Sequence, residues 1–90
     1  MKFDWDPKKA EINLTKHGIS FEEGTEVFGD PFVLDRFDEI HSETEVRFNS
    51  IGLTRNGILF VVFAIYFDEI IWIISVRKAT GREKREYYEK

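Results

Sequence analysis

Residues 55–77, RNGILFVVFAIYFDEIIWIISVR, contain the two most apolar runs of the chain and decide its fold. The runs, residues 58–66 and 70–77, are rich in β-branched and aromatic residues, which is typical of strands covered on both faces. Asn56-Gly57 before the first run is the strongest short hairpin signal, and Asp68-Glu69 turns the chain between the runs. We therefore predict two central antiparallel strands connected by tight turns.

The residues before this segment predict two further strands. Residues 32–37 follow a turn at Pro31, and residues 46–53 alternate imperfectly around Asn49 and Ser50, which suggests a β-bulge. Three successive hairpins would join the four strands. The pattern thus predicts a four-stranded antiparallel sheet.

The first helix is predicted from its end signals. Asp6 is a good N-cap, and Gly18 is placed to end a helix over residues 7–17 in a left-handed conformation. Asn13 and His17 lie four residues apart on the same stripe as the apolar contacts of this helix. We expect both side chains to face the sheet.

Two capping boxes predict two more helices. Ser20 with Glu23 starts a short helix that ends near Gly29, and Thr80 with Glu83 starts a final amphipathic helix. The whole order, two helices, four strands and a helix, predicts an α+β fold with the helices on one face of the sheet.

Length and composition predict a single cytoplasmic domain over residues 1–90. There is no cysteine, which excludes disulfides and thiolate metal sites, while fourteen aromatic residues can fill a compact core. No signal peptide is visible, and the longest apolar run, residues 58–67, is about half of what a membrane-spanning helix needs. We expect no contact with a membrane.

Charge is distributed unevenly along the chain. Residues 1–45 carry a formal charge of −7 and residues 46–90 carry +3. Residues 22–45 contain nine carboxylates and one basic residue, Arg36. The negative electrostatic field of this stretch would attract a positively charged partner. The basic end can hold phosphate, although a solvated helix would have the same composition. Its cations are Arg77, Lys78, Arg82, Lys84 and Arg85.

Two segments, KHGISF at residues 16–21 and IISVRKAT at residues 73–80, make the chain resemble the BrnT family of toxin–antitoxin ribonucleases. The resemblance extends over nearly the whole chain. Further matching positions include Trp5, Asp6, Pro7, Phe28, Asp30, Pro31, Arg47, Phe48, Ile51, Gly52 and Leu53. It implies a RelE-like fold, RNA cleavage without metal or cofactor, and neutralisation by a ribbon-helix-helix antitoxin similar to BrnA.

Metal-free RNA cleavage needs a base for the 2′-hydroxyl proton, cations for the phosphate oxygens and an acid for the leaving oxygen. His17, Arg47 and Arg77 are therefore the candidate catalytic residues, because imidazole transfers protons near neutral pH and guanidinium binds phosphate with two hydrogen bonds. Three further cations are candidate RNA contacts: Lys16, Lys78 and Arg82. The two histidines lack metal-ligand spacing, so no metal site is predicted.

Each of these residues also has a structural alternative. His17 fits the role of a helix terminator that interacts with the last carbonyl groups. Arg77 fits a structural ion pair with an acid from residues 22–45, and His41 fits a surface-loop histidine. The last strand departs from the family, which often has a basic residue in place of Trp72 and a second arginine in place of Lys78; Trp72 can stack on a base or pack in the core.

Two other classes of function remain compatible with the sequence. One is a non-catalytic interaction domain whose acidic half binds a basic partner. The other is an RNA-binding module that does not hydrolyse RNA.

Overall fold

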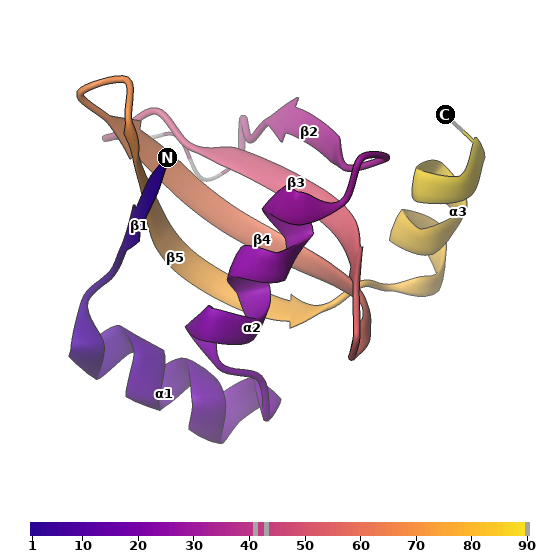
Figure 1. The fold of residues 1–90 in the computed structure, drawn as a ribbon, viewed down its shortest axis with the longest axis horizontal. Helices are drawn as coiled ribbons and strands as arrows, with labels where there is room; N and C mark the ends of the chain where they lie inside the picture. The colour runs from indigo at the N-terminus through magenta and orange to yellow at the C-terminus, as the bar shows by residue number, and fades with distance from the viewer. Residues whose placement is uncertain (41, 43, 90) are drawn as a thin grey trace.

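The structure, a computed structural model, describes residues 1–40, 42 and 44–89. It has an α+β fold in which helices cover a five-stranded sheet of strand order β1-β5-β4-β3-β2 (Figure 1). The strands are β1 (Lys2–Asp4), β2 (Leu34–Phe37), β3 (Phe48–Thr54), β4 (Gly57–Tyr66) and β5 (Ile70–Lys78). The helices are α1 (Pro7–His17), α2 (Phe21–Thr25), the 3₁₀ helix η1 (Glu26–Gly29) and α3 (Gly81–Glu89).

The predicted central hairpins are present. β4 pairs antiparallel with both β3 and β5, and Thr54 is the register partner of Gly57 across the β3–β4 turn. Gly57 has a φ of +93°, which explains why glycine follows Asn56 in this turn.

The prediction of four antiparallel strands is wrong by one strand. β1 pairs with the outer side of β5 in parallel, with Lys2 opposite Ile70 and Asp4 opposite Trp72, so the sheet is mixed. Three residues are too few to show a strand period, and their partners come at the far end of the chain. The residues around β1 therefore gave no indication in the sequence that it would pair with β5.

The predicted bulge in β3 is also misplaced. β3 pairs with β4 without interruption, and the register shift lies instead between Val62 and Phe63 in the pairing of β4 with β5. Asn49 and Ser50 break the apolar alternation because both are buried with polar partners on β2. Asn49 accepts a hydrogen bond from Arg36, and Ser50 donates one to Asp35.

The first helix has the predicted bounds. Asp6 caps α1 by accepting a hydrogen bond from the Lys8 amide at 2.9 Å, and Gly18 ends it with a φ of +70°. Asn13, buried on the face of α1 toward the sheet, donates to the Val76 carbonyl at 2.9 Å and accepts from the Val76 amide at 3.1 Å. α1 is thus fixed to the outer edge of β5, beyond the end of β1.

The helices lie on both faces of the sheet, which corrects the prediction of one helical face. α1, α2 and η1 cover one face, here called the α1–α2 face, whose core includes Phe21, Val27, Val61 and Phe63. α3 covers part of the other, here called the α3 face, where Tyr87 packs with Ile51, Ile58, Phe60 and Val62. The sequence pattern of α3 shows an amphipathic helix but not the face that receives it.

Two glycines allow α2 and η1 to lie close to the sheet. A Cβ atom on Gly24 would be 2.5 Å from Val76 Cγ2, and one on Gly52 would be 2.8 Å from Val27 Cγ1. These close approaches leave no room for a larger residue at either position, and they allow the helical layer to pack close to the sheet.

Candidate functional site

The α3 face presents polar residues in rows across the strands. Because register partners share a face, the alignment of β2 to β5 gives two adjacent rows. One row contains Arg36, Asn49, Val62 and Ser75, and the next contains Leu34, Ile51, Phe60 and Arg77. The predicted shared face of Ser75 and Arg77 is confirmed.

Arg77 is held firmly at the end of β5. Its guanidinium lies 4.1 Å from the ring centroid of Phe60 and forms two hydrogen bonds with Glu83, at 2.7 and 2.9 Å. About a third of the Arg77 side chain, 34%, is exposed, whereas 13% of the Glu83 side chain is. Arg77 therefore combines an ion pair, made with α3 rather than with residues 22–45, and a solvent-accessible cation.

Arg36 is a second arginine on this face, and the sequence did not indicate it as a site residue. Its Nε donates to the Asn49 side-chain oxygen at 3.0 Å, and its Nη1 forms an ion pair with Glu86 of α3. The available signal was its position as the one basic residue among the acids of residues 22–45. Glu83 and Glu86 lie three residues apart, on the same side of α3. This side of α3 therefore forms ion pairs with β5, through Arg77, and with β2, through Arg36.

Arg47 lies just before β3, next to a carboxylate and a phenol. Its Nε is 3.5 Å from Glu45 Oε1 and is buried without a hydrogen bond among the described residues. The Tyr66 hydroxyl donates to the other oxygen of Glu45. This hydrogen bond, together with burial, raises the pKa of the Tyr66 phenol above its usual value.

Trp72 lies next to Tyr66 and extends the cluster of Arg47, Glu45 and Tyr66 across the sheet. It is the register partner of Ala64 on the α3 face, is partly exposed, and its ring centroid is 6.1 Å from that of Tyr66. The residue that replaces the family's frequent basic side chain thus forms an aromatic surface near Arg47.

The two candidate catalytic arginines lie on one face but apart. Arg47 precedes the partner of Phe63, whereas Arg77 pairs with Phe60. This register places their Cα atoms roughly 13 Å apart along the strands and about 10 Å apart across them. Such a separation suits contacts with different phosphates of one RNA strand.

His17 and Lys16 lie at the end of α1, away from these arginines. His17 is partly buried and follows Asn13 by one helical turn, on the side of α1 that faces the edge of β5. In the part of the chain that the structure describes, no hydrogen bond or ion pair links His17 to Arg47 or Arg77. Lys16 is exposed.

Lys78 and Arg82 lie near Arg77 in the sequence and are exposed, one at the end of β5 and one in the first turn of α3. Lys78 is the register partner of Leu59, which belongs to the core of the α1–α2 face, so Lys78 and Arg77 lie on opposite faces at the end of β5. His41 lies outside the described residues. Among the residues described, no group of three or more His, Cys, Asp or Glu side chains is arranged to hold a metal ion.

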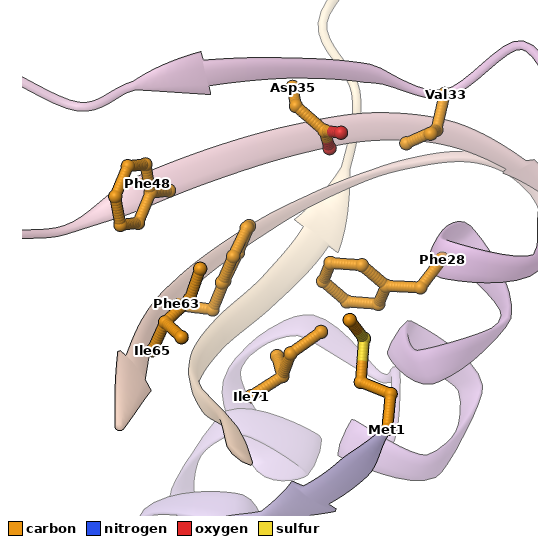
Figure 2. Close-up of a pocket in the computed structure, with 8 residues that line it drawn as sticks. All are labelled: Met1, Phe28, Val33, Asp35, Phe48, Phe63, Ile65 and Ile71. Atoms are coloured by element: carbon orange, nitrogen blue, oxygen red, sulfur yellow. The ribbon is translucent and has the colours of Figure 1, made fainter. Parts of the chain in front are cut away.

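A pocket of about 300 Å³ opens on the α1–α2 face, on the other side of the sheet. In Figure 2 the side chains of Met1, Phe28, Phe63 and Ile71 converge on it, with Asp35 near its rim. Val33, Phe48 and Ile65 complete its lining. This apolar pocket is separate from the arginines of the α3 face.

Comparison with known proteins identifies the class as ribonuclease toxins of type II toxin–antitoxin systems. The model of the family described as "Ribonuclease toxin, BrnT, of type II toxin-antitoxin system" matches residues 5–83. Since the match includes most of the chain, the chain belongs to the BrnT family. This confirms the resemblance to the BrnT family that the sequence indicated, and with it the function as a toxin ribonuclease.

A solved structure supports the same assignment. The crystal structure of the Brucella abortus ribonuclease toxin BrnT matches with a TM-score of 0.67 and 28% sequence identity, over 90% of this chain and 99% of that one. No match was found among curated proteins. Among the described residues, no helix is long and apolar enough to cross a membrane.

Proposed function

We propose that this toxin cleaves RNA without a metal, by attack of a 2′-hydroxyl on the adjacent phosphate, and that residues 1–90 form one toxin domain that acts in the cytoplasm. The observation that carries the proposal is Arg77, oriented by Phe60 and Glu83 yet accessible at the edge of the sheet. A fixed guanidinium can stabilise charge on phosphate oxygens without reorganising during the reaction.

The other cations would bind the RNA backbone. Arg82, in the first turn of α3, would contact a phosphate near Arg77, and Lys78 would contact the strand where it passes the end of β5. Arg47 would contact the strand farther along the sheet. Lys16 would extend the path around the outer edge of β5. Trp72 would stack on a base between these contacts.

Proton transfer requires a separate group. His17 is the proposed acid or base, which requires that the RNA reach the end of α1. The structure adds a second candidate pair, Glu45 with Tyr66, which lies beside Arg47. Substituting His17 with alanine, and separately Glu45 with glutamine, distinguishes them, because only the group that transfers the proton should change the pH profile of cleavage.

The reaction itself is tested with purified toxin and a defined RNA. Cleavage should persist in excess EDTA and should leave a 2′,3′-cyclic phosphate and a 5′-hydroxyl, as expected for attack by the 2′-oxygen. Complete loss of cleavage with chelator would refute the metal-free mechanism, and a 5′-phosphate product would refute 2′-hydroxyl attack.

A second candidate function is RNA binding without hydrolysis. It is favoured by the glutamate partners of Arg47 and Arg77, which offset the positive charge of the two arginines expected to act on phosphate. The same assay separates the two, since a binding module would retain RNA without producing fragments.

As a type II toxin the protein has a cognate protein antitoxin. We propose that this antitoxin has a ribbon-helix-helix fold, as the resemblance to BrnT proteins implies. A crystal structure of the toxin–antitoxin complex would test this, and a different antitoxin fold would refute it.

A further inference from the structure

The pocket on the α1–α2 face lies where the helical layer ends. Its walls come from several parts of the fold: Phe28 from η1, Val33 and Asp35 beside or in β2, Phe63 from β4 and Ile71 from β5. Neither α1 nor α2 contributes a lining residue. The sheet is therefore bare of helix at this corner (Figures 1 and 2).

Exposed apolar side chains surround this opening. Met1 is 87% exposed, Phe37 54% and Ile65 46%. Phe37 continues the apolar surface beyond the pocket because its ring packs edge-on against Phe48, with centroids 6.3 Å apart. Contiguous exposed apolar surface of this kind marks sites where another protein binds.

The charge of the pocket lining indicates what kind of partner the pocket can bind. Of the eight described lining residues, seven are apolar and the eighth, Asp35, is an exposed carboxylate whose Oδ1 accepts the Ser50 hydroxyl. Glu39 adds a second exposed acid after β2. None of the eight has a cationic side chain, so the lining offers no guanidinium or lysine ammonium group to a phosphate backbone. It differs in this from the α3 face, where the arginines lie.

We propose that this pocket is the docking site of the cognate antitoxin. The docking segment would insert a bulky apolar side chain between Phe28, Phe63 and Ile71, and would place a lysine or arginine next to Asp35. This proposal rests on the proposed function in one respect, that the partner of the toxin is its cognate antitoxin. Since the pocket and the arginines lie on opposite faces, docking and occlusion of the RNA site use different parts of the antitoxin.

Asp38 lies within the acidic residues 22–45, but it is not an exposed acid like Asp35 and Glu39. It is 4% exposed, so it cannot attract a partner as a surface charge. The residues to test are therefore Asp35 and Ile65, one for charge and one for apolar contact.

The experiment measures binding of purified cognate antitoxin to full-length toxin variants by biolayer interferometry. Ile65→Arg should weaken binding by about 10-fold or more, as expected for placing a charge within an apolar contact. Ile12→Arg is the matched control, since Ile12 on α1 is 57% exposed and remote from the lining residues. It should bind within about twofold of the wild type.

Asp35→Asn supplies a variant that keeps the fold, because asparagine retains an oxygen to accept the Ser50 hydroxyl. It should slow association and reduce the dependence of association on salt, because a steering charge is lost. Unchanged binding by both pocket variants would overturn the proposal. So would a wild-type dimer that Ile65→Arg dissociates, because the pocket would then bind a second copy of the chain.

RNA cleavage by each free variant provides the remaining readout. Neither pocket variant should alter cleavage, since both lie on the face opposite Arg77. If the wild-type toxin itself cleaved no RNA, the proposed reaction would fail, but the comparison of antitoxin affinities would still decide the docking site.

Discussion

Arg77 and Glu83 form an ion pair with two hydrogen bonds where β5 leads into α3, Nη1 to Oε1 at 2.7 Å and Nη2 to Oε2 at 2.9 Å. Glu83 Oε1 also accepts the Thr80 amide at 2.9 Å, so the same carboxylate caps α3. Burial alone would raise the pKa of Glu83, but the hydrogen bonds from Arg77 and Thr80 lower it overall. The arginine proposed to bind phosphate therefore already binds an anion.

Substituting Glu83 with glutamine should strengthen RNA binding. The change removes a negative charge from the site and frees the Arg77 guanidinium for phosphate, while glutamine can still cap α3. RNA affinity is measured by fluorescence anisotropy with 2′-O-methyl RNA, which cannot be cleaved. Glu89→Gln removes the same charge from the exposed end of α3 and should change affinity little. Unchanged or weaker RNA binding by Glu83→Gln would show that Glu83 does not compete with phosphate for Arg77.

Removing Arg77 should greatly slow cleavage. If Arg77 stabilises the charge that develops on phosphate, Arg77→Ala should reduce the cleavage rate by about 100-fold or more. Arg77→Lys should restore little, because an ammonium group cannot form the two parallel hydrogen bonds. Arg55→Ala, at an exposed arginine paired with Glu26, is the control. Normal specific activity in folded Arg77→Ala protein would assign Arg77 to structure.

Trp72 should report RNA binding directly. If a base stacks on it, 2′-O-methyl RNA should quench the fluorescence of the wild type and of Trp5→Phe, but not that of Trp72→Phe. Trp5 is a suitable reference because it packs against Phe21 beside the core of the α1–α2 face. Trp72→Ala should weaken binding by about 1–3 kcal/mol. Equal quenching in Trp72→Phe would place the RNA elsewhere.

Asn13 should be important for stability. It bonds both backbone groups of Val76 and donates to the Ile19 carbonyl at 3.1 Å, so Asn13→Ala leaves buried groups without partners and should cost about 2–3 kcal/mol. Asn13→Asp should also destabilise, because the carboxylate cannot donate to either carbonyl. Denaturation in urea measures both changes. Thr15→Ala, at an exposed position of α1, should change the free energy of unfolding by less than about 0.5 kcal/mol.

Asn13 also shows what sequence could and could not predict about this fold. The helix period placed its side chain toward the sheet, and the Asp6 and Gly18 signals gave the bounds of α1, because these features depend on near neighbours. The strand edge that Asn13 bonds comes 63 residues later. A similar distance in sequence separates Lys2 from Ile70 and hid the parallel pairing of β1, whereas the Asn-Gly hairpin was evident from adjacent residues.

The candidate site was predicted to a similar extent. Strand alternation placed Ser75 and Arg77 on one face, and the capping box of Thr80 with Glu83 is present. The bond from Glu83 to Arg77 could not be predicted, because it depends on how α3 folds back over the end of β5. Arg36 was missed because its importance comes from the helix that reaches it, α3, at the other end of the chain.

The bond between Tyr87 and Asp30 should make stability depend on pH in alkaline solution. The Tyr87 hydroxyl donates to the Asp30 carboxylate, which together with burial raises the pKa of Tyr87 to about 12. Since the ordinary pKa of tyrosine is about 10, the bond should contribute fully below about pH 10 and be lost as the pH rises toward 12.

Tyr87→Phe tests this dependence. The variant should be less stable than the wild type by about 1 kcal/mol at neutral pH, the usual value of one hydrogen bond, and the difference should shrink between pH 10 and 12. Tyr88→Phe, at a position that is 71% exposed, controls for loss of a hydroxyl from α3. Urea denaturation of the three proteins at several pH values gives the comparison. A difference that stayed constant up to pH 12 would refute a hydrogen bond to Asp30 that is lost when the Tyr87 hydroxyl ionises.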